Sequence, residues 1–167
     1  GAHQRLVPFG LVPRRISAKE WRTLERWIEP RVRAIHAFLH DNHHRQEILR
    51  AGRIPKEIIA GNEAFLSEMV GMKPPGGVYT HIVGTDLVRT GENEFFVLED
   101  NARTPSGVSY MLENRETMLR MFPELFARIR VKPVQDYPTR LLRALQASLP
   151  PAYTGSGKPT VAVLTPG

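Results

Sequence analysis

Residues 86–101 read DLVRTGENEFFVLEDN, and this stretch decides how the chain around it folds. Aromatic and β-branched residues flank a polar turn at residues 90–93, a pattern typical of a β-hairpin. We expect its strands at 78–88 and 94–101. If the hairpin is centred between Glu92 and Asn93, Asp86 lies opposite Glu99, and directly opposed residues share one face of a sheet.

One face of this hairpin is expected to carry three oxygen-bearing side chains. Side chains alternate along a strand, so Glu99 and Asn101 point one way and Asp100 points the other. With Asp86 opposite Glu99, two carboxylates and an amide oxygen converge, which suits a hard cation such as Mg²⁺. A register slip of one residue would place Asp86 opposite Leu98 and separate the set. The competing interpretation is a solvent-exposed hairpin whose acidic residues happen to alternate.

The sequence before the hairpin predicts a helical region. Residues 17–20, SAKE, have the pattern of a capping box, in which Ser17 and Glu20 each accept a backbone N–H. Apolar residues, beginning with Trp21, then recur every three or four positions to about Asp41. This spacing predicts one long amphipathic helix, kinked or divided at Pro30. Shorter helices are expected at 46–51, 55–60 and 63–70.

The sequence after the hairpin predicts further helices at 108–121, from about 122, and at 137–148. Residues 150–157 are rich in Pro and Gly and are typical of a linker. Residues 160–167, TVAVLTPG, predict the first buried strand of a further α/β unit. Both ends look cut, so we expect a fragment of a longer protein.

These elements predict a mixed α/β (α+β) fold in three parts. The expected parts are a helical region at 1–72, the hairpin with its packed helices at 73–149, and the linker with its strand at 150–167.

Composition narrows the class of protein. The 167 residues are 41% hydrophobic, enough for a core, which excludes disorder of the whole chain. The absence of Cys excludes thiolate chemistry, and no apolar run reaches the length of a membrane span. We expect a soluble cytoplasmic protein. The net charge of +6 suits anionic partners such as nucleic acid, but the basic residues are dispersed, which favours a solvated surface.

Two further clusters have the residue types of binding sites. Residues 104–107, TPSG, precede a helix whose first amides can bind a phosphate or a carboxylate, although a plain turn capped by Ser106 is the alternative. Four histidines gather near the end of the long helix. They have the spacing of a transition-metal site, but such histidines more often favour the negative end of a helix dipole. The four are His36, His40, His43 and His44.

Several of these motifs together resemble one family. The residues that carry the resemblance are Asp86, EDNARTPSG at 99–107, PPGG at 74–77 and YMLENR at 110–115. From about residue 17 to 167 the chain is similar to the circularly permuted ATP-grasp proteins, relatives of the glutathionylspermidine synthetases. The resemblance implies an ATP-grasp-like fold. It also implies a ligase activity that uses ATP and Mg²⁺ to join a carboxylate to an amine through an acyl phosphate.

The resemblance also implies roles for individual residues. Asp86, Glu99 and Asn101 would hold Mg²⁺. Arg103 or Arg115 would stabilise the transferred phosphate, although a surface ion pair with Asp100 is the alternative for Arg103. The position of Thr104, Ser106 and Gly107 before a helix, rather than the resemblance, predicts that they bind nucleotide phosphate or substrate carboxylate.

The chain departs from the family at one position. Related ligases often carry an Arg two residues before the hairpin Asp, where this chain has Gly84. The lysines that clamp the nucleotide would lie beyond Gly167, so this segment alone should be inactive. Two alternatives stay open: a basic module that binds nucleic acid or another anion, and a ligase-like scaffold whose catalysis has decayed.

Overall fold

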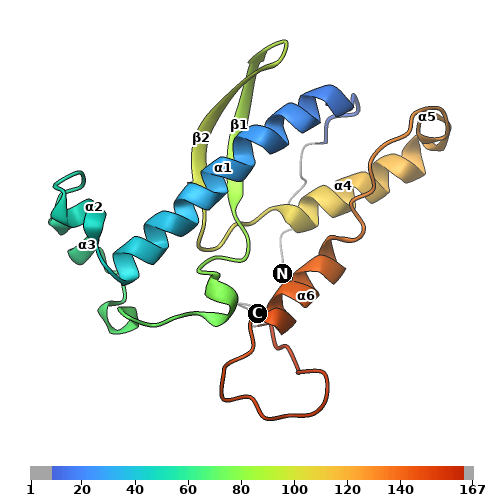
Figure 1. Ribbon diagram of the computed structural model, residues 1–167. Helices are drawn as coiled ribbons and strands as arrows, with labels where there is room; N and C mark the ends of the chain where they lie inside the picture. The colour runs from blue at the N-terminus through green and yellow to red at the C-terminus, as the bar shows by residue number, and fades with distance from the viewer. Residues whose placement is uncertain (1–8, 164–167) are drawn as a thin grey trace, which may run out of the picture.

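The structure, a computed structural model, describes residues 9–163 and shows helices arranged around one hairpin (Figure 1). The strands are β1 (Gly84–Gly91) and β2 (Glu94–Asn101), which pair antiparallel as the one sheet of the described chain. No helix within residues 9–163 combines the length and the apolarity needed to cross a membrane. The helices are α1 (Ala18–His43), α2 (Glu47–Arg50), α3 (Lys56–Ala60), α4 (Val108–Met121), α5 (Pro123–Arg128) and α6 (Tyr137–Ala147), with 3₁₀ turns η1 (Ser67–Met69) and η2 (Pro75–Gly77).

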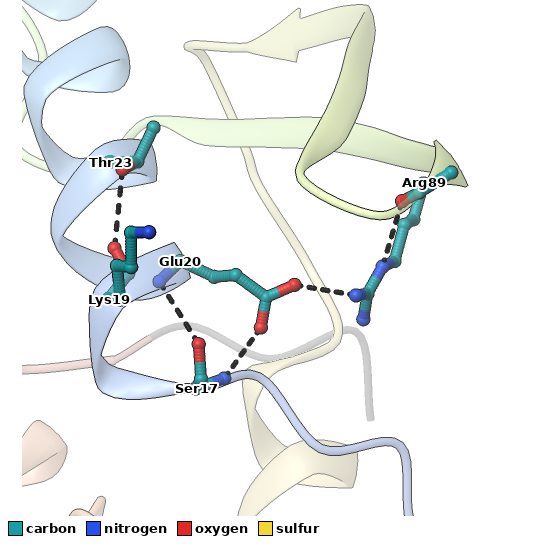
Figure 2. A network of polar contacts seen from close by, with 6 residues as sticks. Ser17, Lys19, Glu20, Thr23 and Arg89 are labelled. Carbon is teal, nitrogen blue, oxygen red and sulfur yellow. Dashed lines mark hydrogen bonds and ion pairs between the residues drawn. The ribbon is translucent and has the colours of Figure 1, made fainter.

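Helix α1 begins at the predicted capping box (Figure 2). The backbone N–H of Ser17 donates to Glu20 Oε2 at 2.8 Å, and the Glu20 N–H donates to Ser17 Oγ at 3.2 Å. The helix then continues for 26 residues through Pro30, so the expected division there is wrong. Proline removes only one backbone N–H donor, and the other backbone hydrogen bonds maintain the helix on both sides of Pro30.

Helix α1 lies along one face of the hairpin (Figure 1). Glu20 near its start binds Arg89 of β1, and Arg31 binds Asp100 of β2. The two helix residues are about three turns apart, a rise of about 16 Å, which matches the roughly 14 Å spanned by the corresponding residues along the strand. Leu24 lies on the same helix face between the two ion pairs and is buried. The two ion pairs therefore fix the hairpin to α1 near both of its ends.

The described elements do not enclose one common core. Three apolar side chains are buried within residues 9–163: Leu24 of α1, Leu49 of α2 and Met118 of α4. Trp21 belongs to the predicted apolar stripe of α1 but is 41% exposed, with the Lys132 ammonium 5.4 Å from its ring centroid. Beyond Leu24 the apolar stripe is only partly buried, at Ile28, Val32, Ile35 and Leu39.

Two predicted elements have different boundaries in the structure. The helix expected at 63–70 is wrong, because Asn62 accepts the N–H of Ala64 through its side chain and starts a turn, so only η1 is helical there. Strand β1 begins at Gly84 rather than at residue 78, because β2 ends at Asn101, the partner of Gly84. The helices after the hairpin lie within a residue or two of their predicted bounds.

The C-terminal strand expected at residues 160–167 is only partly within the described chain. Residues 160–163 have no regular secondary structure. Residues 164–167 lie outside the described residues. The strand, and with it the division into three parts, stays a prediction.

Candidate metal centre on the hairpin

The predicted pairing of Asp86 with Glu99 is confirmed. Gly84 pairs with Asn101, so Asp86, Glu99 and Asn101 occupy the same face of the ladder. All three are exposed, on the face opposite the one that α1 covers. The Asn101 amide donates from Nδ2 to Glu99 Oε1 at 3.1 Å. The three predicted ligands therefore lie together on an accessible surface.

The chemistry of this donor set fits a hard divalent cation. Asp86 and Glu99 bring carboxylates from opposed positions, and neither belongs to an ion pair found within residues 9–163. The hydrogen bond of Asn101 uses its N–H, which leaves its Oδ1 as a ligand. In the described chain no third His, Asp or Glu side chain joins these two carboxylates to complete a metal site. The remaining positions around Mg²⁺ would therefore belong to water or phosphate oxygens.

Asp100 lies on the reverse face and is held by two other elements. Arg31 Nε of α1 donates to its Oδ2 at 2.7 Å, and Arg31 Nη2 lies 2.6 Å from the same oxygen in an ion pair. Thr85 of β1 donates to its Oδ1 at 2.9 Å. These donors, with Arg31 first, hold the pKa of Asp100 below its ordinary value. The alternative ion pair between Asp100 and Arg103 is wrong, because Arg31 occupies that place.

Gly84 allows a close approach of the turn that follows β2. A Cβ at this position would lie 3.1 Å from the Pro105 Cβ and 3.7 Å from the Asn101 Cβ. A contact of 3.1 Å is tighter than most real Cβ contacts, so a side chain at this position would displace the turn. The departure from the family pattern at Gly84 therefore coincides with tight packing of the turn at 104–107 against β1.

The turn at 104–107 leads into α4 without a side-chain cap. Gly107 is the capping residue, at φ 95°, and no side chain accepts the first amides of α4. The alternative of a turn capped by Ser106 is therefore wrong. Thr104 and Ser106 are exposed, as is Arg103. The first backbone N–H groups of this 14-residue helix can donate hydrogen bonds to a bound anion.

Arg115 has a different environment from Arg103. Its Nη1 donates to the Lys132 carbonyl at 2.9 Å. It also lines a cavity of about 290 Å³ with Leu119 and Phe126. Within residues 9–163 no hydrogen bond or ion pair joins Arg115 to the predicted ligands. Its catalytic role stays a prediction, while its contact with Lys132 links α4 to the loop after α5.

The histidines at the end of α1 are not placed to hold a metal, as judged over the described residues, and His36, His43 and His44 make hydrogen bonds. His44 Nε2 lies 2.7 Å from the Tyr79 hydroxyl, and His36 Nε2 lies 3.0 Å from the Thr80 carbonyl oxygen. The Thr80 hydroxyl donates in turn to the Ala102 carbonyl at 2.5 Å. The histidines therefore attach the segment before β1, and through it the end of β2, to α1.

The comparisons with known proteins identify the family of this chain. Residues 13–167 match the family described as "A circularly permuted ATPgrasp", and the chain belongs to this family. The helices and the antiparallel hairpin form a mixed α/β arrangement that is consistent with part of an ATP-grasp domain.

The relatives of this chain are longer proteins. It is 52% identical over 164 residues to an uncharacterized protein of Mycobacterium bovis, covering 98% of this chain and 29% of the relative. It is 45% identical to an uncharacterized protein of a Synechocystis species, covering 98% and 34%. It is 39% identical to a Frankia casuarinae protein named "Putative glutamate–cysteine ligase 2-2", covering 98% and 19%. The chain thus spans about a third or less of the length of these curated relatives.

Proposed function

We propose that this chain supplies the metal-binding part of an ATP- and Mg²⁺-dependent ligase that joins a carboxylate to an amine. The observation that carries the proposal is the position of Asp86 opposite Glu99, with Asn101 on the same exposed face. Family membership supports it, because ATP-grasp proteins use ATP. A relative named as a glutamate–cysteine ligase is consistent with a carboxylate and an amine as the substrate classes.

Each residue of the site has a role in this proposal. Asp86, Glu99 and Asn101 hold Mg²⁺, which when bound neutralises charge on the phosphates of ATP. Arg103 follows the ligands directly and stabilises negative charge on the transferred phosphoryl group. The amides at the start of α4 bind a phosphate or the substrate carboxylate. In the overall reaction the carboxylate takes the γ-phosphoryl group of ATP, and the amine displaces phosphate to form the amide.

The test uses the complete polypeptide that carries this sequence and measures release of phosphate from ATP with Mg²⁺, carboxylates and amines. We expect Glu99→Gln and Asp86→Asn to lower the rate of phosphate release by more than roughly 100-fold. Loss of a residue that only orients a metal ligand can already lower activity by about that factor, and these two residues are the proposed ligands themselves. Glu92→Gln is the matched control, because Glu92 lies at the turn of the same hairpin, outside both strands.

Three outcomes would contradict the proposal. Full activity of Glu99→Gln would exclude the metal assignment. Nucleotide binding without release of phosphate, with every amine offered, would indicate a decayed scaffold. Binding to nucleic acid that weakens steeply with salt and is unchanged in Glu99→Gln would indicate a basic binding module.

A further inference from the structure

The hairpin changes register directly beside the candidate ligands. Toward the turn, Leu87 lies opposite Val97, but at the base Asp86 lies opposite Glu99. Leu98 is the extra residue of this β-bulge, and it is 69% exposed. If the register of the three middle pairs, from Leu87–Val97 to Arg89–Phe95, continued to the base, Asp86 would face Leu98 and the ligand set would separate. A second shift, between Arg89 and Gly91, restores the register of the base at the turn pair Gly91–Glu94. Because two shifts lie between the turn and the ligands, the turn does not by itself fix the register of the ligands.

One pair of residues next to the bulge is joined across the two strands by a side-chain hydrogen bond. Thr85 lies opposite Asp100, and its hydroxyl donates to Asp100 Oδ1 at 2.9 Å. Arg31 Nε donates to Oδ2 of the same carboxylate at 2.7 Å, and Arg31 Nη2 lies 2.6 Å from that oxygen in an ion pair. The Asp100 side chain is only 15% exposed, so this ion pair is better shielded from water than an ordinary surface pair.

We propose that Asp100, held by Arg31 and Thr85, is the positioning residue that fixes the register of the metal ligands from the reverse face of the hairpin. Glu99 and Asn101 flank Asp100 in the sequence, so fixing Asp100 toward α1 directs both neighbours to the opposite face. In the slipped register Thr85 would face Glu99, and its bond to Asp100 would be lost. The inference rests on the proposed function, because that proposal assigns the ligands.

The first experiment measures Mn²⁺ binding to the complete polypeptide by electron paramagnetic resonance, with Mn²⁺ as the probe for Mg²⁺. We expect Asp100→Asn and Thr85→Val to weaken Mn²⁺ binding by about 10- to 100-fold, the usual effect of losing an outer partner of a metal site. Thr85→Ser keeps the hydroxyl and should restore binding. Asp136→Asn is the matched control, since Asp136 forms a 2.6 Å ion pair with Arg140 within one exposed helical turn.

The second experiment tests the register directly. Deletion of Leu98 removes the bulge beside the ligands, so that the pairs from Asp86–Glu99 to Arg89–Phe95 form one continuous register, and it leaves the shift between Arg89 and Gly91 unchanged. In this background the register no longer depends on Asp100. We therefore expect Asp100→Asn to weaken Mn²⁺ binding much less in the deletion variant than in the wild-type protein.

The outcomes separate this inference from the proposed function. If Glu99→Gln abolishes Mn²⁺ binding while Asp100→Asn only lowers the melting temperature, Asp100 has a structural role and the inference is overturned. An equal loss of affinity from Asp100→Asn with and without Leu98 also overturns it. If the wild-type protein binds no Mn²⁺, or if the Glu99→Gln variant binds Mn²⁺ as tightly as the wild type, the proposed function and this inference fail together.

Discussion

Glu20 and Arg89, 69 residues apart in the chain, join the start of α1 to strand β1 through a hydrogen-bonded ion pair of 2.5 Å. Figure 2 shows that the same carboxylate accepts the backbone N–H of Ser17 with its other oxygen. These contacts lower the pKa of Glu20, mainly through the Ser17 N–H, with a smaller contribution from the Arg89 charge. The cap of the helix and the attachment of the hairpin therefore depend on one side chain.

Substitutions at Glu20 should separate its two contacts. Glu20→Gln keeps a side chain that can cap the helix but loses the charge facing Arg89, whereas Glu20→Ala loses both. We expect thermal unfolding to give melting temperatures in the order wild type, Glu20→Gln, Glu20→Ala. Glu29→Gln, which disrupts an exposed ion pair with Arg33 on the same helix, should change little. Equal melting temperatures for Glu20→Ala and Glu29→Gln would contradict this role.

Leu24 should contribute more stability than any exposed apolar residue of the helices. Its side chain lies between the two ion pairs of α1 and is 3% exposed. We expect Leu24→Ala to lower the free energy of unfolding by about 3 kcal/mol, through lost burial and the cavity left behind. Chemical denaturation checks this value, with Leu142→Ala of α6, 45% exposed, as the control. A similar loss in both variants would show that α1 does not pack on the hairpin as described.

Most helices and strands could be predicted from the sequence because the residues that start and end them lie close together in the chain. The capping box predicted the start of α1. The position of the polar turn predicted the pairing of Asp86 with Glu99 correctly because the two register shifts of the hairpin cancel each other. The prediction of a helix at 63–70 was wrong because the Asn62 side chain forms a competing hydrogen bond with the backbone. The spacing of apolar residues gives no sign of such a bond.

The parts of the site that sequence reasoning missed depend on distant contacts. Arg31 binds Asp100 from 69 positions away, and nothing near Arg31 in the sequence distinguishes it from the other arginines of α1. The bulge at Leu98 was missed for a related reason, since it belongs to the pairing of two strands rather than to one strand. Thr85 had a signal, because the predicted register already placed it opposite Asp100.

The segment that contains Tyr79 should loosen as the pH falls from 7.5 to 5.5. Burial lowers the pKa of His44 below its ordinary value of 6.5, with smaller contributions from the charges of His40, Lys73 and His43. A lowered pKa means that the folded state favours neutral His44. The stabilisation is complete above pH 6.5 and is lost as the pH falls through the folded pKa. The depressed carboxylates titrate at lower pH and do not contribute in this range.

Hydrogen exchange measures this loosening at the amides of residues 65–80. His44→Phe removes the titrating group and should remove most of the pH dependence of protection. Tyr79→Phe keeps His44 but removes its hydroxyl partner, which lies 2.7 Å away, and should lower protection already at pH 7.5. The same pH dependence in His44→Phe and the wild type would show that another group controls this segment.

The two arginines suggested by the sequence should respond differently to truncation. Arg103 is exposed beside the ligands, whereas Arg115 donates to the Lys132 carbonyl. We expect Arg103→Ala to lower the rate of phosphate release by about 100-fold or more, the effect of removing one donor to developing negative charge, with an unchanged melting temperature. Arg115→Ala should lower the melting temperature, because α4 loses its bond to the loop after α5. A slower reaction in Arg115→Ala, without a change in stability, would instead give Arg115 the catalytic role.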